Sequence, residues 1–192
     1  MQDVLQYAYT REEEEAVTRA IEARFGRIAR TLRERAPAGA GLRVDLCVIP
    51  AGAGATIVTR GMSAGEMRVP GELRGQGLER AELCVTLPRT WEFRSGEGRW
   101  RWPLQWLRLL ARLPAEEDTW LGWGHTVPNG APFADNTRLS SILLLDDASP
   151  AAVNPCFYRL VPLYEEELQF KLEHGTQALW SAPRAICPRH WI

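Results

Sequence analysis

His125 is the residue whose chemistry could make this chain a hydrolase. It lies in a Trp-Gly-His-Thr run, and Asp118 and Asp135 are close enough in sequence to orient its ring. An acid–histidine pair of this kind activates a nucleophilic hydroxyl in many hydrolases. The nearest serines, Ser140 and Ser141, lie in an apolar run that is typical of a strand. We therefore favour a structural role, in which His125 ties down a loop through hydrogen bonds, and we keep the hydrolase as an alternative.

The sequence evidence for a metal site or a nucleotide site is weaker than that for a hydrolase. Cys187 and His190 could supply two metal ligands, but a structural zinc site needs four, and no second pair has finger spacing. The glycines of residues 52–54 lead into a β-branched run, whereas a dinucleotide-binding loop leads into a helix. The three successive acids of residues 165–167 fit the solvated start of a helix, where the dipole favours them. The sequence thus predicts no metal site, no cofactor and no catalytic residue.

Tryptophan dominates the middle of the chain, where residues 91–123 contain six of the eight tryptophans. Such large aromatic surfaces belong either in the core or at a protein interface. Trp100 and Trp102 are one residue apart and are flanked by Arg99 and Arg101. If this segment is a strand, both tryptophans share one face and both arginines share the other. Tryptophan and arginine are enriched at interface hot spots, so core packing and a partner surface both stay open.

A second aromatic segment runs from Trp120 to His125 and is followed by Asn129 and Asn136. We expect it to form an ordered, partly exposed groove wall. Its two glycines permit tight turns, and Trp120 and Trp123 offer a large area at a low entropy cost. The asparagines can satisfy backbone groups of the loop. The alternative is that the whole segment belongs to the core.

The elements that position these residues alternate too irregularly for a doubly wound fold. A helix is expected over residues 11–36, begun by a capping box of Thr10 and Glu13. Alternating apolar residues from Leu42 to Val48, followed by a return at residues 56–59, predict a hairpin. Together with the later elements, this order predicts an α+β fold. Further strands are expected at residues 83–87, 139–145 and 157–161.

Two more helices are expected in the second half of the chain. Pro103 suits the first position of a helix, and Pro114 would end that helix. The last helix begins near Tyr164, and Glu167 and Lys171 form a favourable pair on it. One face of this helix carries Leu168, Leu172, Gly175 and Leu179.

Composition excludes several classes of protein. The 192 residues are 45% hydrophobic and 24% charged, as in a globular chain and unlike a disordered one. A net charge of −1 argues against a general electrostatic grip on nucleic acid or on an anionic membrane. No apolar run approaches the ~20 residues that span a bilayer, and residues 1–9 lack a secretory signal. We expect a cytoplasmic protein with free cysteine thiols and with no nucleic-acid or membrane partner.

Four stretches of the chain, taken together, resemble the bacterial Suppressor-of-fused family in order and spacing. The resemblance covers about residues 42–175, and residues 181–192 depart from the usual ending of the family. It implies an α+β domain with a mixed, largely antiparallel sheet flanked by helices, and we expect one such domain over residues 1–192. The stretches are Thr56 to Ser63 with Met67, Ala81 to Pro88 with Trp91, Trp102 to Leu145, and Val161 to Leu168 with Lys171 and Gly175.

The resemblance also implies a function, because members of this family work by binding protein. Animal relatives hold transcription factors of the Hedgehog pathway in check, and single-domain bacterial relatives are proposed to be immunity proteins of polymorphic toxin systems. We therefore expect a non-catalytic protein-binding domain with a cognate toxin as its partner. The alternatives are a module that sequesters an extended segment of a transcriptional regulator, and a hydrolase that uses His125. The partner-binding candidates are Trp100, Trp102, Trp120, Trp123, His125, Asn129 and Asn136.

Overall fold

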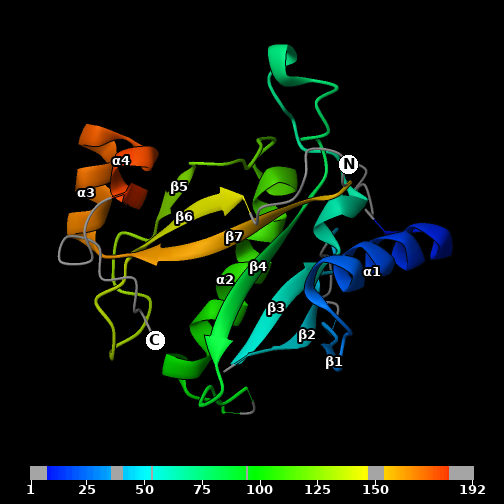
Figure 1. Ribbon diagram of the computed structural model, residues 1–192, viewed down its shortest axis with the longest axis horizontal. Helices are drawn as coiled ribbons and strands as arrows, with labels where there is room; N and C mark the ends of the chain where they lie inside the picture. Colours follow the sequence, from blue (N-terminus) through cyan, green and yellow to red (C-terminus); the bar gives the residue numbers. More distant parts are fainter. Residues whose placement is uncertain (1–7, 36–40, 53, 94, 147–153, 182–192) are drawn as a thin grey trace, which may run out of the picture.

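The structure is a computed structural model that describes residues 8–35, 41–52, 54–93, 95–146 and 154–181. Its strands are β1 (Arg30–Leu32), β2 (Asp45–Ala51), β3 (Gly54–Arg60), β4 (Ala81–Pro88), β5 (Thr126–Pro128), β6 (Ser141–Asp146) and β7 (Cys156–Leu163). Within the described residues they form one seven-stranded sheet in the order β1-β2-β3-β4-β7-β6-β5 (Figure 1). Neighbouring strands are antiparallel except for β4 and β7. The expected α+β class, with a mixed and largely antiparallel sheet, is confirmed.

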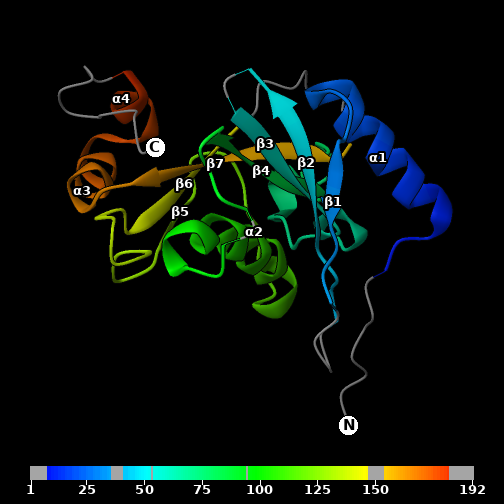
Figure 2. The ribbon, with the colours of Figure 1, turned by 90° about the horizontal axis from the view of Figure 1, so that it is seen from below.

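Helices cover both faces of this sheet. They are α1 (Arg11–Phe25), α2 (Gly98–Glu116), α3 (Glu165–His174) and α4 (Thr176–Ser181). α2 lies on one face, while α1 and the α3–α4 pair lie at opposite ends of the other face (Figure 2). The α2 side holds the larger apolar cluster, in which Leu107 and Leu110 pack against Leu83. Smaller clusters lie under α1, around Ile21, and under α4, around Leu179.

The strands expected from sequence alternation are confirmed. β2 and β3 form the predicted antiparallel hairpin, and β4 follows as the third strand. β6 has neighbours on both sides, as its apolar run suggested. The long connection from β3 to β4 contains two short 3-10 helices, η1 (Met62–Ala64) and η2 (Gly71–Leu73). No helix in the described ranges combines the length and the apolar character needed to cross a membrane.

α1 begins as expected but ends earlier than expected. The capping box is present, since Thr10 Oγ1 accepts from the N–H of Glu13 and the Glu13 carboxylate accepts from the N–H of Thr10. The expected extent of 11–36 is wrong, because the helix stops at Phe25. Gly26 takes a φ of 98°, which helical residues do not adopt. The chain then returns as the edge strand β1, whose backbone pairs with β2.

α2 starts at Gly98 rather than at Pro103, so Trp100 and Trp102 are helical. The prediction that they share one face of a strand is therefore wrong. Pro103 lies inside the helix, where its missing N–H costs one backbone hydrogen bond. Pro114 does not end the helix either, because it is buried and the helix continues to Glu116. Burial of the apolar side of α2 against the sheet compensates for these local defects.

The C-terminal part of the described chain contains two helices where one was expected. Gly175 has a φ of 87° and separates α3 from α4. Leu179 is buried against β6 and β7, whereas Leu172 is 61% exposed, so the two leucines do not share a buried face. The chain turns at the glycine, and α4 can therefore cover the sheet while much of α3 faces solvent.

The expectation that all the acids at the start of α3 are solvated is wrong. Glu167 is buried, and its carboxylate accepts a hydrogen bond of 2.8 Å from the N–H of Tyr164. Lys171 donates to the Thr126 hydroxyl at 3.3 Å instead of pairing with Glu167. Capping of the first turn of α3 has therefore replaced the expected side-chain pair.

Candidate functional site

The tryptophans at the start of α2 form an aromatic cluster with the loop that precedes β6. Trp102 is buried, and its ring stacks on Phe133 with 4.9 Å between centroids and 10° between planes. Trp100 is half-buried and meets Trp91 edge-on at 5.1 Å. The guanidinium of Arg99 lies over the Trp100 ring, 5.2 Å from its centroid. Trp102 is thus a core residue, whereas Trp100 lies at the margin of the cluster.

The run from Trp120 to His125 is held to β6 through its backbone. Gly124 donates to the carbonyl of Leu144 at 2.8 Å, and Leu144 donates to the carbonyl of His125 at 2.9 Å. Gly124 has a φ of 78°, a left-handed conformation that suits glycine. Trp120 is half-buried and lies edge-on to the His125 ring at 4.4 Å. Trp123, in contrast, is 49% exposed.

The two asparagines of the candidate set lie on the loop that follows β5, and both are exposed. Asn129 closes a turn, because its side chain donates to the carbonyl of Ala131 at 2.7 Å. Asn136 lies further along the same loop. Between them, Phe133 stacks on Trp102. The loop and the α2 tryptophans, which are remote in sequence, therefore meet at the Phe133 ring.

His125 is not joined to an acid or a serine in the described part of the chain. Burial and the nearby charge of Lys171 lower the pKa of His125. Asp118 pairs with Arg68 on the surface. The hydroxyls of Ser140 and Ser141 are buried without a hydrogen-bond partner. The relay that the hydrolase alternative requires is not assembled among these residues.

The sequence also contains a Gly-x-Ser-x-Gly run, Gly61–Gly65, which sequence reasoning centred on His125 misses. In many hydrolases such a run is a nucleophile elbow between a strand and a helix. Here Ser63 is 3% exposed, and its hydroxyl donates to the Glu82 carboxylate at 2.8 Å. The N–H groups of Gly61 and Ser63 donate to the same carboxylate at 3.1 Å. The groups that an elbow offers to a substrate are thus engaged by the protein itself.

Glu82 is the centre of a buried polar cluster that joins β4 to Tyr9, two residues before α1. Its carboxylate accepts from the hydroxyl of Thr59 at 2.5 Å and from that of Tyr9 at 2.6 Å. Burial raises the pKa of Glu82, and these hydrogen bonds oppose the increase. Burial and the charge of Glu82 raise the pKa of Tyr9. Tyr9 also forms part of the wall of a pocket at the surface.

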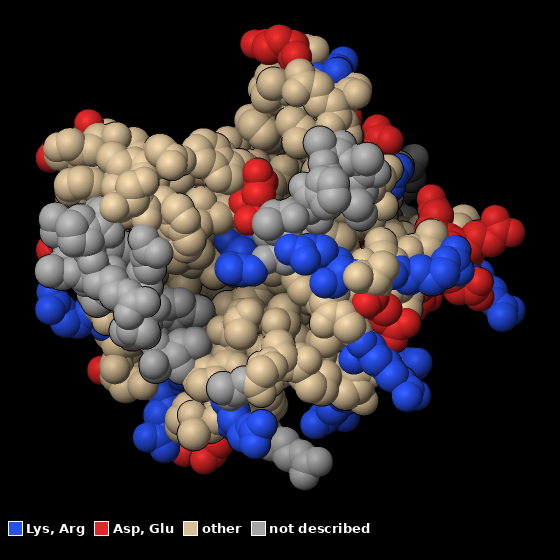
Figure 3. Space-filling model, in the orientation of Figure 1, with Lys and Arg blue, Asp and Glu red and all other residues tan. Residues whose placement is uncertain are grey.

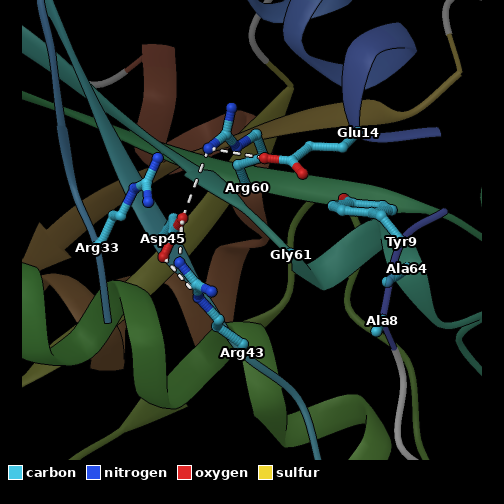
Figure 4. A pocket seen from close by; sticks show the side chains of 9 residues that line it. All are labelled: Ala8, Tyr9, Glu14, Arg33, Arg43, Asp45, Arg60, Gly61 and Ala64. Atoms are coloured by element: carbon cyan, nitrogen blue, oxygen red, sulfur yellow. Dashed lines mark hydrogen bonds and ion pairs between the residues drawn. The ribbon is translucent and has the colours of Figure 1, made fainter. Parts of the chain in front are cut away.

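This pocket has a volume of about 260 Å³ and lies where α1 approaches β2 and β3 (Figure 4). None of its charged residues was among the partner-binding candidates predicted from the sequence. Arginines and carboxylates face each other in the pocket and form a polar wall. The lining has more arginines than carboxylates, so its positive charge is in excess. The lining residues are Ala8, Tyr9, Glu14, Arg33, Arg43, Asp45, Arg60, Gly61 and Ala64.

Pairing of β2 with β3 builds the polar wall of the pocket. The antiparallel register places Asp45 opposite Arg60. Arg43 holds Asp45 through two hydrogen bonds of 3.1 Å, and Arg60 bridges Asp45 at 3.5 Å and Glu14 at 3.1 Å. The backbone at Gly61 passes so close to the segment before β2 that an added Cβ would lie 2.1 Å from the carbonyl oxygen of Arg43. Glycine at this position therefore allows the wall to close.

Arg33 completes the pocket from the segment after β1. Its side chain is exposed and forms no ion pair with any described residue. The adjacent Glu34 is engaged elsewhere, since it pairs with Arg112 and accepts from the N–H of Val44 at 3.0 Å. A local signal existed for one part of the pocket, because Arg43 and Asp45 are two residues apart and point to the same side of an extended chain.

Residues 43–186 match the profile of the protein family described as Suppressor of fused protein. Among solved structures, the fold is similar to that of a SUFU homolog from Neisseria gonorrhoeae FA 1090, with a TM-score of 0.62 and 14% identity. The match covers 90% of this chain and 88% of that chain. No curated protein matches the sequence. At this identity, the structural similarity shows the fold alone.

Proposed function

The chain belongs to the Suppressor of fused family, and on this premise we propose that it is an immunity protein that binds and neutralises a cognate toxin. The family match over residues 43–186 carries the proposal, because members of this family are in general regulatory binding domains and not enzymes. Single-domain bacterial members are the ones for which a toxin-neutralising role has been suggested. A cytoplasmic location would follow, since the antidote must meet the toxin where it is made.

We place the partner surface along the edge strand β5 and the loop that follows it. Trp123 supports this placement, because it presents a large exposed ring on a backbone that is bonded to β6. An indole in this setting loses little entropy when a partner covers it, and tryptophan is enriched among interface hot spots. Asn129 and Asn136 add exposed hydrogen-bonding groups nearby in the chain. Trp102 and Trp120 would support this surface from within.

The decisive experiment is co-expression with the toxic domain encoded next to this chain's gene. The expected result is restored growth together with a complex that survives size-exclusion chromatography. If co-expression gave no protection and no complex, the toxin-neutralising role would be refuted. If an unbiased pull-down returned only transcriptional regulators, the toxin would be replaced by the alternative of a sequestering module.

A further inference from the structure

We propose that the pocket of Arg33, Arg43 and Arg60 binds an aspartate or glutamate side chain from an acidic segment of the partner protein. The inference rests on the proposed function only in assuming that the partner is a protein. It concerns residues outside the β5 surface, and it predicts that the segment of the partner that reaches them is negatively charged.

The carboxylates that line the pocket are already satisfied. Asp45 is 6% exposed, and it accepts two hydrogen bonds from Arg43 and one of 3.0 Å from the N–H of Glu34. Glu14 is engaged by Arg60 at 3.1 Å. The three arginines of the lining outnumber its two carboxylates. The pocket therefore has more donor capacity than its own acids consume.

The unused donors belong mainly to Arg33 and Arg43. Arg33 has no ion pair among the described residues, and the Arg43 side chain is 52% exposed. A guanidinium has five N–H donors in a fixed fork, and Arg43 commits two of its nitrogens to Asp45. Planar forks of this kind match a carboxylate in a bidentate geometry. The chemistry of the pocket thus fits a carboxylate better than a neutral group.

The size and lining of the pocket favour a side chain over a larger ligand. A volume of about 260 Å³ lies below the usual range for small-molecule sites, which begins at ~300 Å³. The lining also includes Ala8, Gly61 and Ala64, which are small enough to let another backbone approach closely. An amino-acid side chain with part of its backbone would fill such a space.

The surface on the β1 side of the pocket carries further positive charge, whereas α1 on the other side presents exposed glutamates. Basic side chains gather below α1, in the region of β1 (Figure 3). They extend the basic field of the pocket along the edge of the sheet, although the whole chain has a net charge of −1. Such a local field attracts an acidic segment and orients it before contact. The exposed arginines of this edge are Arg27, Arg30, Arg33 and Arg35.

The test measures binding of a fluorescein-labelled hexaglutamate peptide by anisotropy, with hexaglutamine as the neutral probe. Arg33→Ala should weaken hexaglutamate binding about tenfold, which is the effect of one charge-assisted hydrogen-bonding group. Arg33 suits this test because it holds no described part of the fold together. Arg35→Ala is the matched control, since it removes an equal exposed charge two residues away and outside the pocket lining.

Equal losses of hexaglutamate binding in Arg33→Ala and Arg35→Ala would refute a specific site in the pocket. They would show attraction by the general positive charge of this surface instead. Tight binding of inorganic phosphate without binding of hexaglutamate would overturn the acidic segment as the occupant. In the complex with the partner, Arg33→Ala should again weaken binding while Arg35→Ala does not. A toxin complex indifferent to Arg33→Ala would refute this inference and leave the immunity role intact. If hexaglutamate binding depended on Arg33 but no toxin complex formed, the immunity role would be refuted and the acidic-segment pocket would stand.

Discussion

Tyr9 donates its phenolic hydrogen to the buried carboxylate of Glu82 at 2.6 Å, across 73 positions of the sequence. Through this bond the segment before α1 is fastened to β4. The same carboxylate holds the turn after β3, because Gly61 and Ser63 also donate to it. One buried acid thus joins three segments that meet beside the arginine pocket.

Tyr9→Phe should lower the free energy of unfolding by about 1.5–3 kcal/mol, the usual contribution of a hydrogen bond to a charged group. The ring packing stays, so the loss reports the hydrogen bond. Urea denaturation at neutral pH measures it. A double-mutant cycle with Glu82→Leu, which removes the acceptor, isolates the pair, and a coupling energy near zero would contradict the role assigned to this bond.

Gly61→Ala should destabilise the protein by more than about 1–3 kcal/mol, the cost of a strained backbone conformation alone. Gly61 has a φ of 149°, and an added Cβ would lie 2.1 Å from the carbonyl oxygen of Arg43, just before β2. Thermal denaturation of Gly61→Ala is compared with that of Gly71→Ala. At Gly71 no atom lies within 4 Å of an added Cβ, and its φ is not positive. Similar melting temperatures for the two variants would contradict the close contact between Gly61 and the backbone of Arg43.

Trp123→Ala should weaken partner binding by about 2 kcal/mol or more, as at interface hot spots. Because Trp123 is 49% exposed, its loss should change the unfolding free energy by only about 0.5–1 kcal/mol. Trp102→Ala is the contrasting variant, since loss of a buried aromatic ring costs about 3–5 kcal/mol. Melting temperature and partner affinity are measured on the same samples. A large fall in melting temperature for Trp123→Ala, with normal binding by the folded fraction, would remove Trp123 from the partner surface.

The protein should lose stability as the pH falls below the ordinary histidine value of 6.5, and His125 should contribute to this loss. Its pKa is lowered in the folded state, so the unfolded chain takes up the proton first. The contribution of His125 is complete above 6.5 and is lost as the pH falls through its lowered folded pKa. Unfolding free energies from about pH 7.5 to about pH 5.5 span the range in which histidines titrate.

His125→Gln should flatten this pH dependence, because the variant cannot bind the proton in either state. His174→Gln removes an exposed histidine of α3 and serves as the control. If both variants flattened the curve equally, the special position of His125 beside Trp120 and Lys171 would not be its cause.

Much of the fold follows from local rules that act within a few residues. Thr10 and Glu13 are three positions apart, and their capping box could be predicted because both partners lie in one helical turn. Alternating apolar residues predicted β2, β3 and β4 because the side-chain period of a strand places every second residue in the core. The family motifs, which cover about residues 42–175, extended this information to the sheet apart from β1. The helix ends were less predictable, since Pro103 and Pro114 are tolerated where burial outweighs a lost hydrogen bond.

Periodicity and short motifs are enough to predict the fold class, the family and most of the strands, because both depend on residues that stay close in the chain. Which tryptophans are buried and which charges meet depends on the packing of distant segments. Trp102 and Trp123 are the same residue type, yet one is buried against Phe133 and the other is half exposed. Asp45 faces Arg60 only because β2 and β3 pair in one register, and a shift by one residue would turn the side chains of one strand to the opposite face. Arg33 reaches this pair only because the chain returns as β1, where an uninterrupted helix had been predicted.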